Sequence, residues 1–129
     1  MCCRCVLVTS IDDVVELLEI DEVDPDVESF EPSYNVGPQR LLPVAFQNNS
    51  ERRLENMIWG LQPPWEHQPS KKHLFNNRFE TLTKKHTFAK LLPDNRCVVA
   101  CDGYYEWRKR GKHKIPYYIH PKKDLFFYM

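Results

Sequence analysis

Residues 97–107 read Cys97-Val98-Val99-Ala100-Cys101-Asp102-Gly103-Tyr104-Tyr105-Glu106-Trp107. The first five residues are apolar and β-branched at their centre, which is typical of a buried strand. A second strand is predicted from Tyr104 to Trp107, directly after the Asp-Gly pair. Glu106 then lies between aromatic side chains just beyond a buried strand, a setting that suits a general acid or base. A strand-end glutamate that points to water is the alternative.

The segments around residues 97–107 alternate between strands, helices and loops. Further strands are predicted at 5–8, 41–46, 54–59, 116–119 and 125–129, and residues 77–81 are predicted to be extended. Helices are predicted over 11–20, with Ser10 as N-cap and Asp13 as its reciprocal acid, and over 83–92, ending before Pro93. An acidic loop is predicted at 21–32, an exposed basic loop at 66–75 and a basic turn at 108–114.

The chain has 129 residues, enough for one domain with a modest core. It contains no apolar run near the roughly 20 residues that cross a bilayer, and Arg4 interrupts the region where a signal peptide would be apolar. We therefore expect an intracellular protein without a membrane partner. Because a natural chain seldom ends on residues as apolar as 125–129, we expect the sequence to be a fragment.

Charge is distributed unevenly, although the formal net charge is zero. Residues 11–32 hold ten acids and no Lys or Arg, whereas residues 71–129 hold fourteen Lys and Arg against five Asp and Glu, a net of +9. The basic half would attract phosphate, and two solvated faces are the simpler interpretation.

The cysteines are odd in number, which favours free thiols or a metal site over a disulfide framework; they are Cys2, Cys3, Cys5, Cys97 and Cys101.

Cys2 follows the initiator methionine, which is normally removed before so small a residue. Its removal leaves an amine and a thiol on adjacent carbons. The amine condenses with an aldehyde, and the thiol then closes a five-membered thiazolidine ring. The alternative is an ordinary cysteine in an unstructured terminus.

One polar cluster alternates along the predicted extended segment at 77–81. Asn76, Arg78 and Glu80 would share one strand face. An amide, a guanidinium and a carboxylate together can orient a polar substrate. A surface strand with an ordinary Arg–Glu pair is the alternative.

Two proline-bearing loops carry planar side chains. Residues 32–39 include Asn35 and Pro38, and residues 59–65 include Trp59 and Trp65. Such rigid loops suit stacking on unpaired bases. Turn chemistry with core tryptophans is the alternative, and it fits Trp59 better.

Taken in order, these segments resemble the SOS-response-associated peptidase family, whose eukaryotic members are called abasic site processing proteins. That family opens with Met-Cys-Gly-Arg and continues with Tyr-Asn-x-x-Pro, Trp-Gly-x-x-Pro-x-Trp, Asn-x-Arg-x-Glu and Asp-Gly-Phe/Tyr-Tyr/Phe-Glu-Trp segments. The matching residues here are Cys2 and Arg4, 34–38, 59–65, 76–80 and 102–107. The resemblance implies an α+β fold of mostly antiparallel strands in a curved, barrel-like sheet with a few helices. It covers residues 1–129 as the N-terminal portion of a single domain.

The resemblance also implies a function in DNA damage: covalent capture of abasic sites in single-stranded DNA, with lyase and autopeptidase character and no cofactor or metal. Self-cleavage or an aminopeptidase would remove Met1. The implied protein is a monomer, nuclear in a eukaryote and cytoplasmic in a bacterium. The implied site residues are Cys2 as nucleophile, Asn76 as the group that positions it, Glu106 as proton shuttle, Arg4 and Arg78 on flanking phosphates, and Asn35, Pro38 and Trp65 along the DNA path.

The sequence departs from the family pattern at two points. Cys3 stands where the family has glycine, and the catalytic His of a His-Asp-Arg-type segment would lie beyond residue 129.

Two other functions stay open. One is a zinc module built on the pairs Cys2/Cys5 and Cys97/Cys101. The other is a non-catalytic fragment that binds single-stranded nucleic acid through its basic half.

Overall fold

The computed structural model describes residues 3–65, 74–122 and 127–128. The predicted strand at 125–129 and the predicted loop at 66–75 therefore lie largely outside the described residues. In chain order the elements are β1 (Cys5–Leu7), α1 (Ile11–Leu18), β2 (Glu22–Val23), the 3₁₀ helix η1 (Pro25–Ser29), β3 (Ser33–Val36), β4 (Leu41–Asn48), β5 (Glu51–Ile58), α2 (Phe79–Leu82), α3 (His86–Leu91), β6 (Cys97–Cys101), β7 (Gly103–Arg110), β8 (His113–Ile119) and β9 (Phe127–Tyr128).

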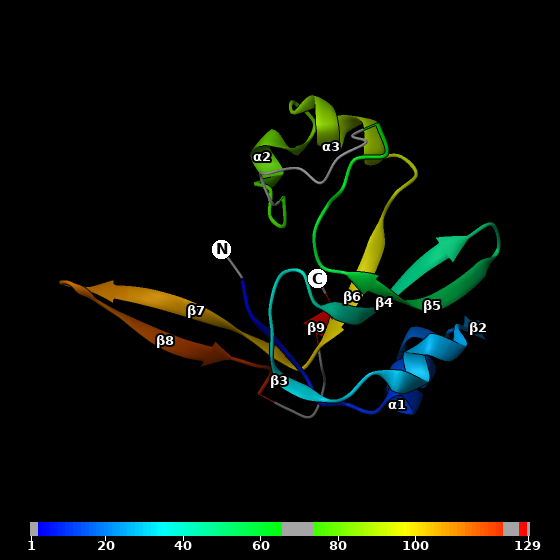
Figure 1. Ribbon diagram of the computed structural model, residues 1–129, viewed down its shortest axis with the longest axis horizontal. Coiled ribbons are helices and arrows are strands. Elements are labelled where there is room, and N and C mark those ends of the chain that lie inside the picture. The colour runs from blue at the N-terminus through cyan, green and yellow to red at the C-terminus, as the bar shows by residue number, and fades with distance from the viewer. Residues whose placement is uncertain (1–2, 66–73, 123–126, 129) are drawn as a thin grey trace.

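The strands form two sheets, so the predicted α+β class with mostly antiparallel pairing is confirmed. One sheet has the order β3-β1-β7-β8 and the other β2-β5-β4-β6-β9, and only the β2–β5 pairing is parallel among the pairings described. The sheets do not close into a barrel. The chain passes from one sheet to the other between β6 and β7, through the single residue Asp102. Residues 97–107 thus form the two predicted strands, but each strand belongs to a different sheet (Figure 1).

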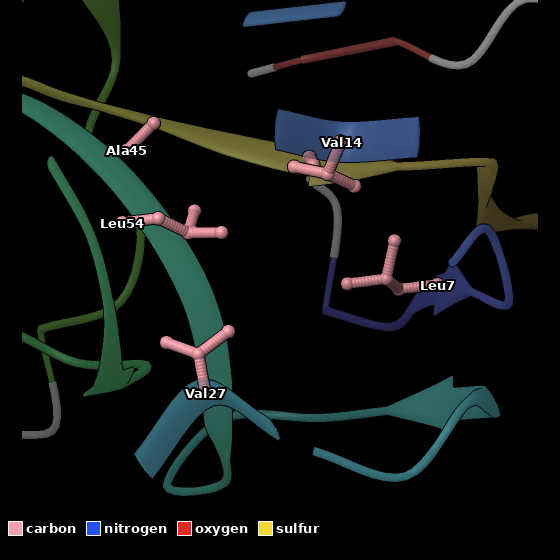
Figure 2. Packing of buried hydrophobic residues seen from close by; sticks show 6 residues of the cluster. Leu7, Val14, Val27, Ala45 and Leu54 are labelled. Atoms are coloured by element: carbon pink, nitrogen blue, oxygen red, sulfur yellow. The ribbon is translucent and has the colours of Figure 1, made fainter. Parts of the chain in front are cut away.

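Two small clusters of buried side chains form the core. In the first, side chains from β1, α1, η1, β4 and β5 point toward a common interior (Figure 2); they are Leu7, Val14, Val27, Ala45 and Leu54, and Ala100 of β6 completes the cluster. The second joins Cys5, Val36, Leu42, Val44 and Cys101 across the two sheets. Each fully buried aliphatic side chain contributes roughly 1.5–3 kcal/mol through the hydrophobic effect.

The first helix begins as its sequence predicts. Ser10 is the N-cap, its hydroxyl accepts from the Asp13 backbone N–H at 3.2 Å, and it donates to the Asp13 carboxylate at 2.6 Å. The helix ends at Leu18, because Glu19 takes a left-handed conformation with φ 50°. Val14 faces the core.

The predicted loop at 21–32 is wrong in two places. Residues 22–23 form β2, and residues 25–29 form η1, where the Asp24 side chain accepts from the Asp26 N–H at 2.9 Å. The buried Val27 explains why this acidic stretch is ordered, since its side chain is anchored in the first cluster. Part of the predicted loop at 32–39 is likewise a strand, β3, which pairs with β1.

The basic turn predicted at 108–114 is shorter than expected. Strand β7 continues to Arg110 and β8 begins at His113, which leaves two residues in the turn. Gly111 has φ +61°, a conformation that glycine adopts without strain. The result is a long hairpin that extends away from the rest of the molecule (Figure 1).

The segment after residue 74 differs most from its prediction. Residues 79–82 are helical, although 77–81 were predicted to be extended. The predicted helix over 83–92 is observed as α3, which is shorter at both ends and stops before Pro93 as expected. None of the described helices is long and apolar enough to cross a membrane.

Candidate functional site

The N-terminal strand β1 lies between β3 and β7, and Asp102 fastens it there. The Asp102 carboxylate accepts the backbone N–H of Val8 at 2.6 Å and that of Thr9 at 3.0 Å, and it also accepts the Thr9 hydroxyl. Its own N–H donates to the Val6 carbonyl at 2.8 Å. A single side chain at the junction of the two sheets therefore holds the start of the chain in place.

The pairing of β1 with β7 brings the start of the chain to Glu106. Cys5 is paired with Tyr104, and the Tyr105 N–H donates to the Arg4 carbonyl at 3.0 Å. Continued by two residues, this antiparallel register sets Cys3 opposite Glu106. Glu106 is half-buried, as Cys3 is.

Asn76 reaches the same place from a distant part of the chain. Its side-chain N–H donates to the Cys3 sulfur at 3.9 Å, across 73 residues of sequence. The predicted catalytic residues Asn76 and Glu106 thus converge on the residue that follows Cys2. Cys2 itself lies outside the described residues.

Arg4 and Asn35, two of the predicted DNA-binding residues, lie together at the edge of the same sheet. The Arg4 guanidinium donates to the Asn35 side-chain oxygen at 3.4 Å. It also covers Gly37, where an added Cβ would lie 2.8 Å from Arg4 Nη1. Because glycine has no Cβ, the Arg4 guanidinium can occupy the space beside Gly37. Pro38 follows in the turn to β4, which is held by a Gln39 N–H to Trp59 carbonyl bond of 2.8 Å.

Arg4 and Glu106 belong to opposite faces of the sheet. Successive residues of a strand alternate between faces, so Cys3, Cys5 and Glu106 share one face. Arg4 falls on the other face, together with Tyr105 opposite it. The predicted phosphate ligand Arg4 and the predicted proton shuttle Glu106 therefore lie on opposite faces of this sheet.

The prediction that Asn76, Arg78 and Glu80 share one strand face is wrong. Arg78 is the N-cap of α2 and Glu80 lies in its first turn, because the chain turns helical after residue 78. The Thr81 N–H and hydroxyl both bond to the Arg78 carbonyl, at 3.0 and 3.2 Å, and begin this helix. Asn76 is half-buried beside Cys3, whereas Arg78 and Glu80 are exposed.

Trp65 lies on the surface beside α3, with 40% of its area exposed. The His86 ring meets it edge-on at 6.2 Å between centroids, and the Lys90 ammonium lies 5.2 Å from the ring centroid. A planar ring next to a cation suits an unpaired base and its phosphate. No described contact joins Trp65 to Cys3 or Asn76, so its place on a DNA path stays a prediction.

An apolar pocket of about 520 Å³ adjoins the candidate site. Its lining includes Cys5, Trp59, Phe75, Asn76 and Phe88. The Trp59 indole donates to the Phe75 carbonyl at 3.5 Å, and its ring packs against the second core cluster. The interpretation of Trp59 as a core residue is therefore confirmed.

The zinc alternative is not supported by the arrangement of the cysteines. Cys97 and Cys101 lie at the two ends of β6, and four residues of strand span about 13 Å, too far for two thiolates on one ion. Cys5 and Cys101 are packed in the second core cluster. Among the described residues, no group of three His, Cys, Asp or Glu side chains is close enough to hold a metal ion.

Sequence reasoning missed two features of this site. One is the role of Asp102, which contacts residues 93 and 94 positions away. The other is the contact between Cys3 and Asn76. The Asp-Gly pair signals a break between strands, but nothing in the sequence shows which backbone groups the aspartate will bind.

Comparison with known proteins identifies one family and relatives that share one description. The sequence model of the family described as SOS response associated peptidase (SRAP) matches residues 1–129. The abasic site processing protein YoaM of Bacillus subtilis is 36% identical over 129 residues, which cover 98% of this chain and 56% of that protein. The abasic site processing protein HMCES of Xenopus tropicalis is 43% identical over 110 residues, which cover 75% of this chain and 33% of that protein.

A solved structure has the same fold. The crystal structure of a protein from Bacteroides thetaiotaomicron superposes with a TM-score of 0.84 at 25% identity, over 99% of this chain and 58% of that one. The chain thus spans a little more than half the length of its Bacillus relative and of this structure.

Proposed function

The chain belongs to the SOS response associated peptidase (SRAP) family, and on that premise we propose that it captures abasic sites in single-stranded DNA through a covalent bond to Cys2. The observation that carries the proposal is the convergence on Cys3, the neighbour of Cys2. Asn76 donates to its sulfur, and the β1–β7 register sets it opposite Glu106. The names of the relatives, which specify abasic site processing, support the choice of substrate.

The proposed chemistry begins with loss of Met1, by self-cleavage or by an aminopeptidase. The freed Cys2 amine attacks the aldehyde carbon of the ring-opened abasic sugar, and one water leaves as the imine forms. The Cys2 thiol then adds across the carbon–nitrogen double bond, and its proton passes to the nitrogen. The product is a thiazolidine, and the sequence consumes no oxidant or reductant.

The residues around Cys3 have complementary roles in this chemistry. Glu106 donates a proton to the departing hydroxyl and takes one back from the amine. Asn76 orients the amine and the opened sugar. Glu106 lies two residues along β7 from Tyr104, the partner of Cys5, and therefore on the same face, which supports a role near the start of the chain.

DNA binding would use the other predicted residues. Arg4 and Arg78 hold phosphates on either side of the lesion. Asn35 lies within 3.4 Å of the Arg4 guanidinium, and Pro38 follows it in the next turn. Trp65 offers a ring for a flanking base. We propose single-stranded DNA because its unstacked bases can reach such rings, and a monomer because one chain supplies all these groups.

Because the proposed substrate is DNA, we propose that the protein is located in the nucleus of a eukaryote or the cytoplasm of a bacterium. Lyase character, which the family resemblance implies, is part of the same proposal. A non-catalytic protein that binds single-stranded DNA through its basic half is the second candidate, because the β7–β8 hairpin is strongly basic.

Intact mass spectrometry separates the two candidates. The purified protein is incubated with a single-stranded oligonucleotide that carries one abasic site, and with the same oligonucleotide after its aldehyde has been capped by methoxyamine. We expect loss of Met1 and a new species with the mass of protein plus oligonucleotide less one water, only with the uncapped DNA. A protein that binds both oligonucleotides equally and forms no species stable to denaturation would contradict covalent capture and leave the second candidate.

A further inference from the structure

The β7–β8 hairpin carries a concentrated positive charge that the proposed chemistry does not use. Between Glu106 and Asp124 the sequence contains no carboxylate. In the hairpin itself the basic side chains are all exposed; they are Arg108, Lys109, Arg110, Lys112 and Lys114. None of them forms an ion pair with another residue of the described ranges 3–65, 74–122 and 127–128.

The hairpin register divides these charges between two faces. The pairing runs without a bulge from Tyr104–Ile119 to Arg110–His113. Residues two apart on β7 share a face, so Arg108 and Arg110 follow Glu106 on one side. Lys109 lies on the other side with Lys114, its direct cross-strand partner.

The face that carries Glu106 is the face of Cys3 and Cys5 as well. A row of Glu106, Arg108 and Arg110 therefore leads from the candidate site out along the hairpin. Successive members of such a row are about 6.7 Å apart along the strand. The opposite face holds aromatic rings nearer the base of the hairpin, where Tyr105 and Tyr118 meet at 5.3 Å between centroids.

The free hairpin also holds like charges against each other. Lys109 and Lys114 are directly opposite, a pairing that destabilises an antiparallel ladder. Arg110 faces His113 in the last pair before the turn.

We propose that the hairpin is an arm that binds the DNA backbone beyond the lesion, with Arg108 and Arg110 as its phosphate ligands. The proposal rests on the proposed function, because it extends the path of the same DNA strand. Arginine suits the task, since its planar guanidinium donates two hydrogen bonds to one phosphate and keeps its charge. DNA fits better than an acidic protein, because the row is continuous with the site at Cys3.

Two double variants of equal charge test the assignment of the face. Arg108→Gln/Arg110→Gln removes two charges from the Glu106 face, and Lys109→Gln/Lys114→Gln removes two from the opposite face. Binding of an unmodified thymidine oligonucleotide, without an abasic site, is measured by fluorescence anisotropy over a range of salt concentrations. Thermal unfolding confirms that both variants fold.

We expect the arginine variant to bind more weakly and to lose about 1.4 from the slope of log affinity against log salt, the value for two phosphate contacts on a single strand. The lysine variant should keep the wild-type slope. Equal losses in both variants, or none in either, would overturn the proposal. The proposal would also be overturned if polyglutamate displaced the labelled oligonucleotide as effectively as unlabelled DNA does, and if the arginine variant lost this displacement.

The outcome is independent of cross-linking, because the probe has no aldehyde. If the wild-type protein does not bind this oligonucleotide at all, the arm is refuted, whereas covalent capture is decided separately by the intact-mass experiment with abasic DNA. If the wild type binds and the arginine variant binds equally well, only the arm is refuted.

Discussion

The side-chain amide of Asn76 lies 3.9 Å from the sulfur of Cys3 and donates a hydrogen bond to it. This contact joins the irregular segment before α2 to the start of the chain. By the resemblance described above, the family has glycine at the position of Cys3, and a glycine has no side chain to make this contact. The contact places the Asn76 amide beside Cys3, the residue that follows Cys2 in the chain.

The relation between Cys3 and Asn76 can be tested by a double-mutant cycle. Cys3→Ala should slow adduct formation about two- to tenfold, because the loss of one hydrogen bond costs about 0.5–1.5 kcal/mol. Cys3→Ser keeps an acceptor and should retain most of the rate. If Cys3 acts through Asn76, Cys3→Ala should have no further effect in an Asn76→Ala background. Additive losses in rate constant, measured on denaturing gels, would show that Cys3 acts on its own.

Removal of the nucleophile should abolish capture without abolishing binding. Cys2→Ala is expected to form no adduct with abasic DNA and to keep its salt-dependent affinity for single strands. Cys2→Ser should form at most an imine that hydrolyses, because a hydroxyl closes the ring poorly. Adduct stability is followed by mass spectrometry after denaturation, and an adduct of Cys2→Ala would refute the assignment of the nucleophile.

Loss of the proton shuttle should affect rate more than affinity. Glu106→Gln keeps the size of the side chain and is expected to slow capture by about 10²–10⁴-fold, as for other general acid or base residues. Glu80→Gln is the matched control, because Glu80 is exposed in α2. Single-turnover kinetics with abasic DNA measure both variants. Equal rates for Glu106→Gln and the wild type would assign Glu106 a structural role.

Asp102 should matter for stability although it takes no part in the chemistry. Asp102→Ala leaves the backbone N–H groups of Val8 and Thr9 without their acceptor, at a cost of about 1–3 kcal/mol each. Asp94→Ala, at an exposed position, is the control and should change the free energy of unfolding little. Urea denaturation measures the difference. Equal stability of the two variants would mean that other contacts hold β1.

The first core cluster gives a prediction about packing. Leu54 is fully buried among the side chains of Figure 2. Leu54→Ala should lower the free energy of unfolding by about 2–5 kcal/mol through lost burial and a residual cavity. Leu41→Ala, in the paired strand β4 and 56% exposed, should cost much less. Comparable losses in chemical denaturation would show that the cluster does not anchor the fold.

Several elements were predictable because they depend on neighbouring residues. The Ser10–Asp13 cap, the end of α3 before Pro93 and the strands on either side of Asp102-Gly103 follow from local preferences. Local reasoning failed where a distant contact decided the conformation. Val27 orders the acidic stretch through the core. The segment after Arg78 is a different case, because its helix begins with local bonds from Thr81 to the Arg78 carbonyl and only its alternating polar pattern favoured a strand.

The candidate site divides in the same way. The sequence by itself determined which groups are present: a cysteine at position 2, an amide at Asn76, a carboxylate at Glu106 and a series of arginines and lysines. Only the tertiary structure decided that Asn76 meets Cys3, that Glu106 and Arg4 lie on opposite faces of one sheet, and that Arg108 and Arg110 continue the row of Glu106. The physical reason is that strand pairing joins residues about a hundred positions apart, and its register, set by hydrogen bonds such as those of Asp102, assigns each side chain to a face.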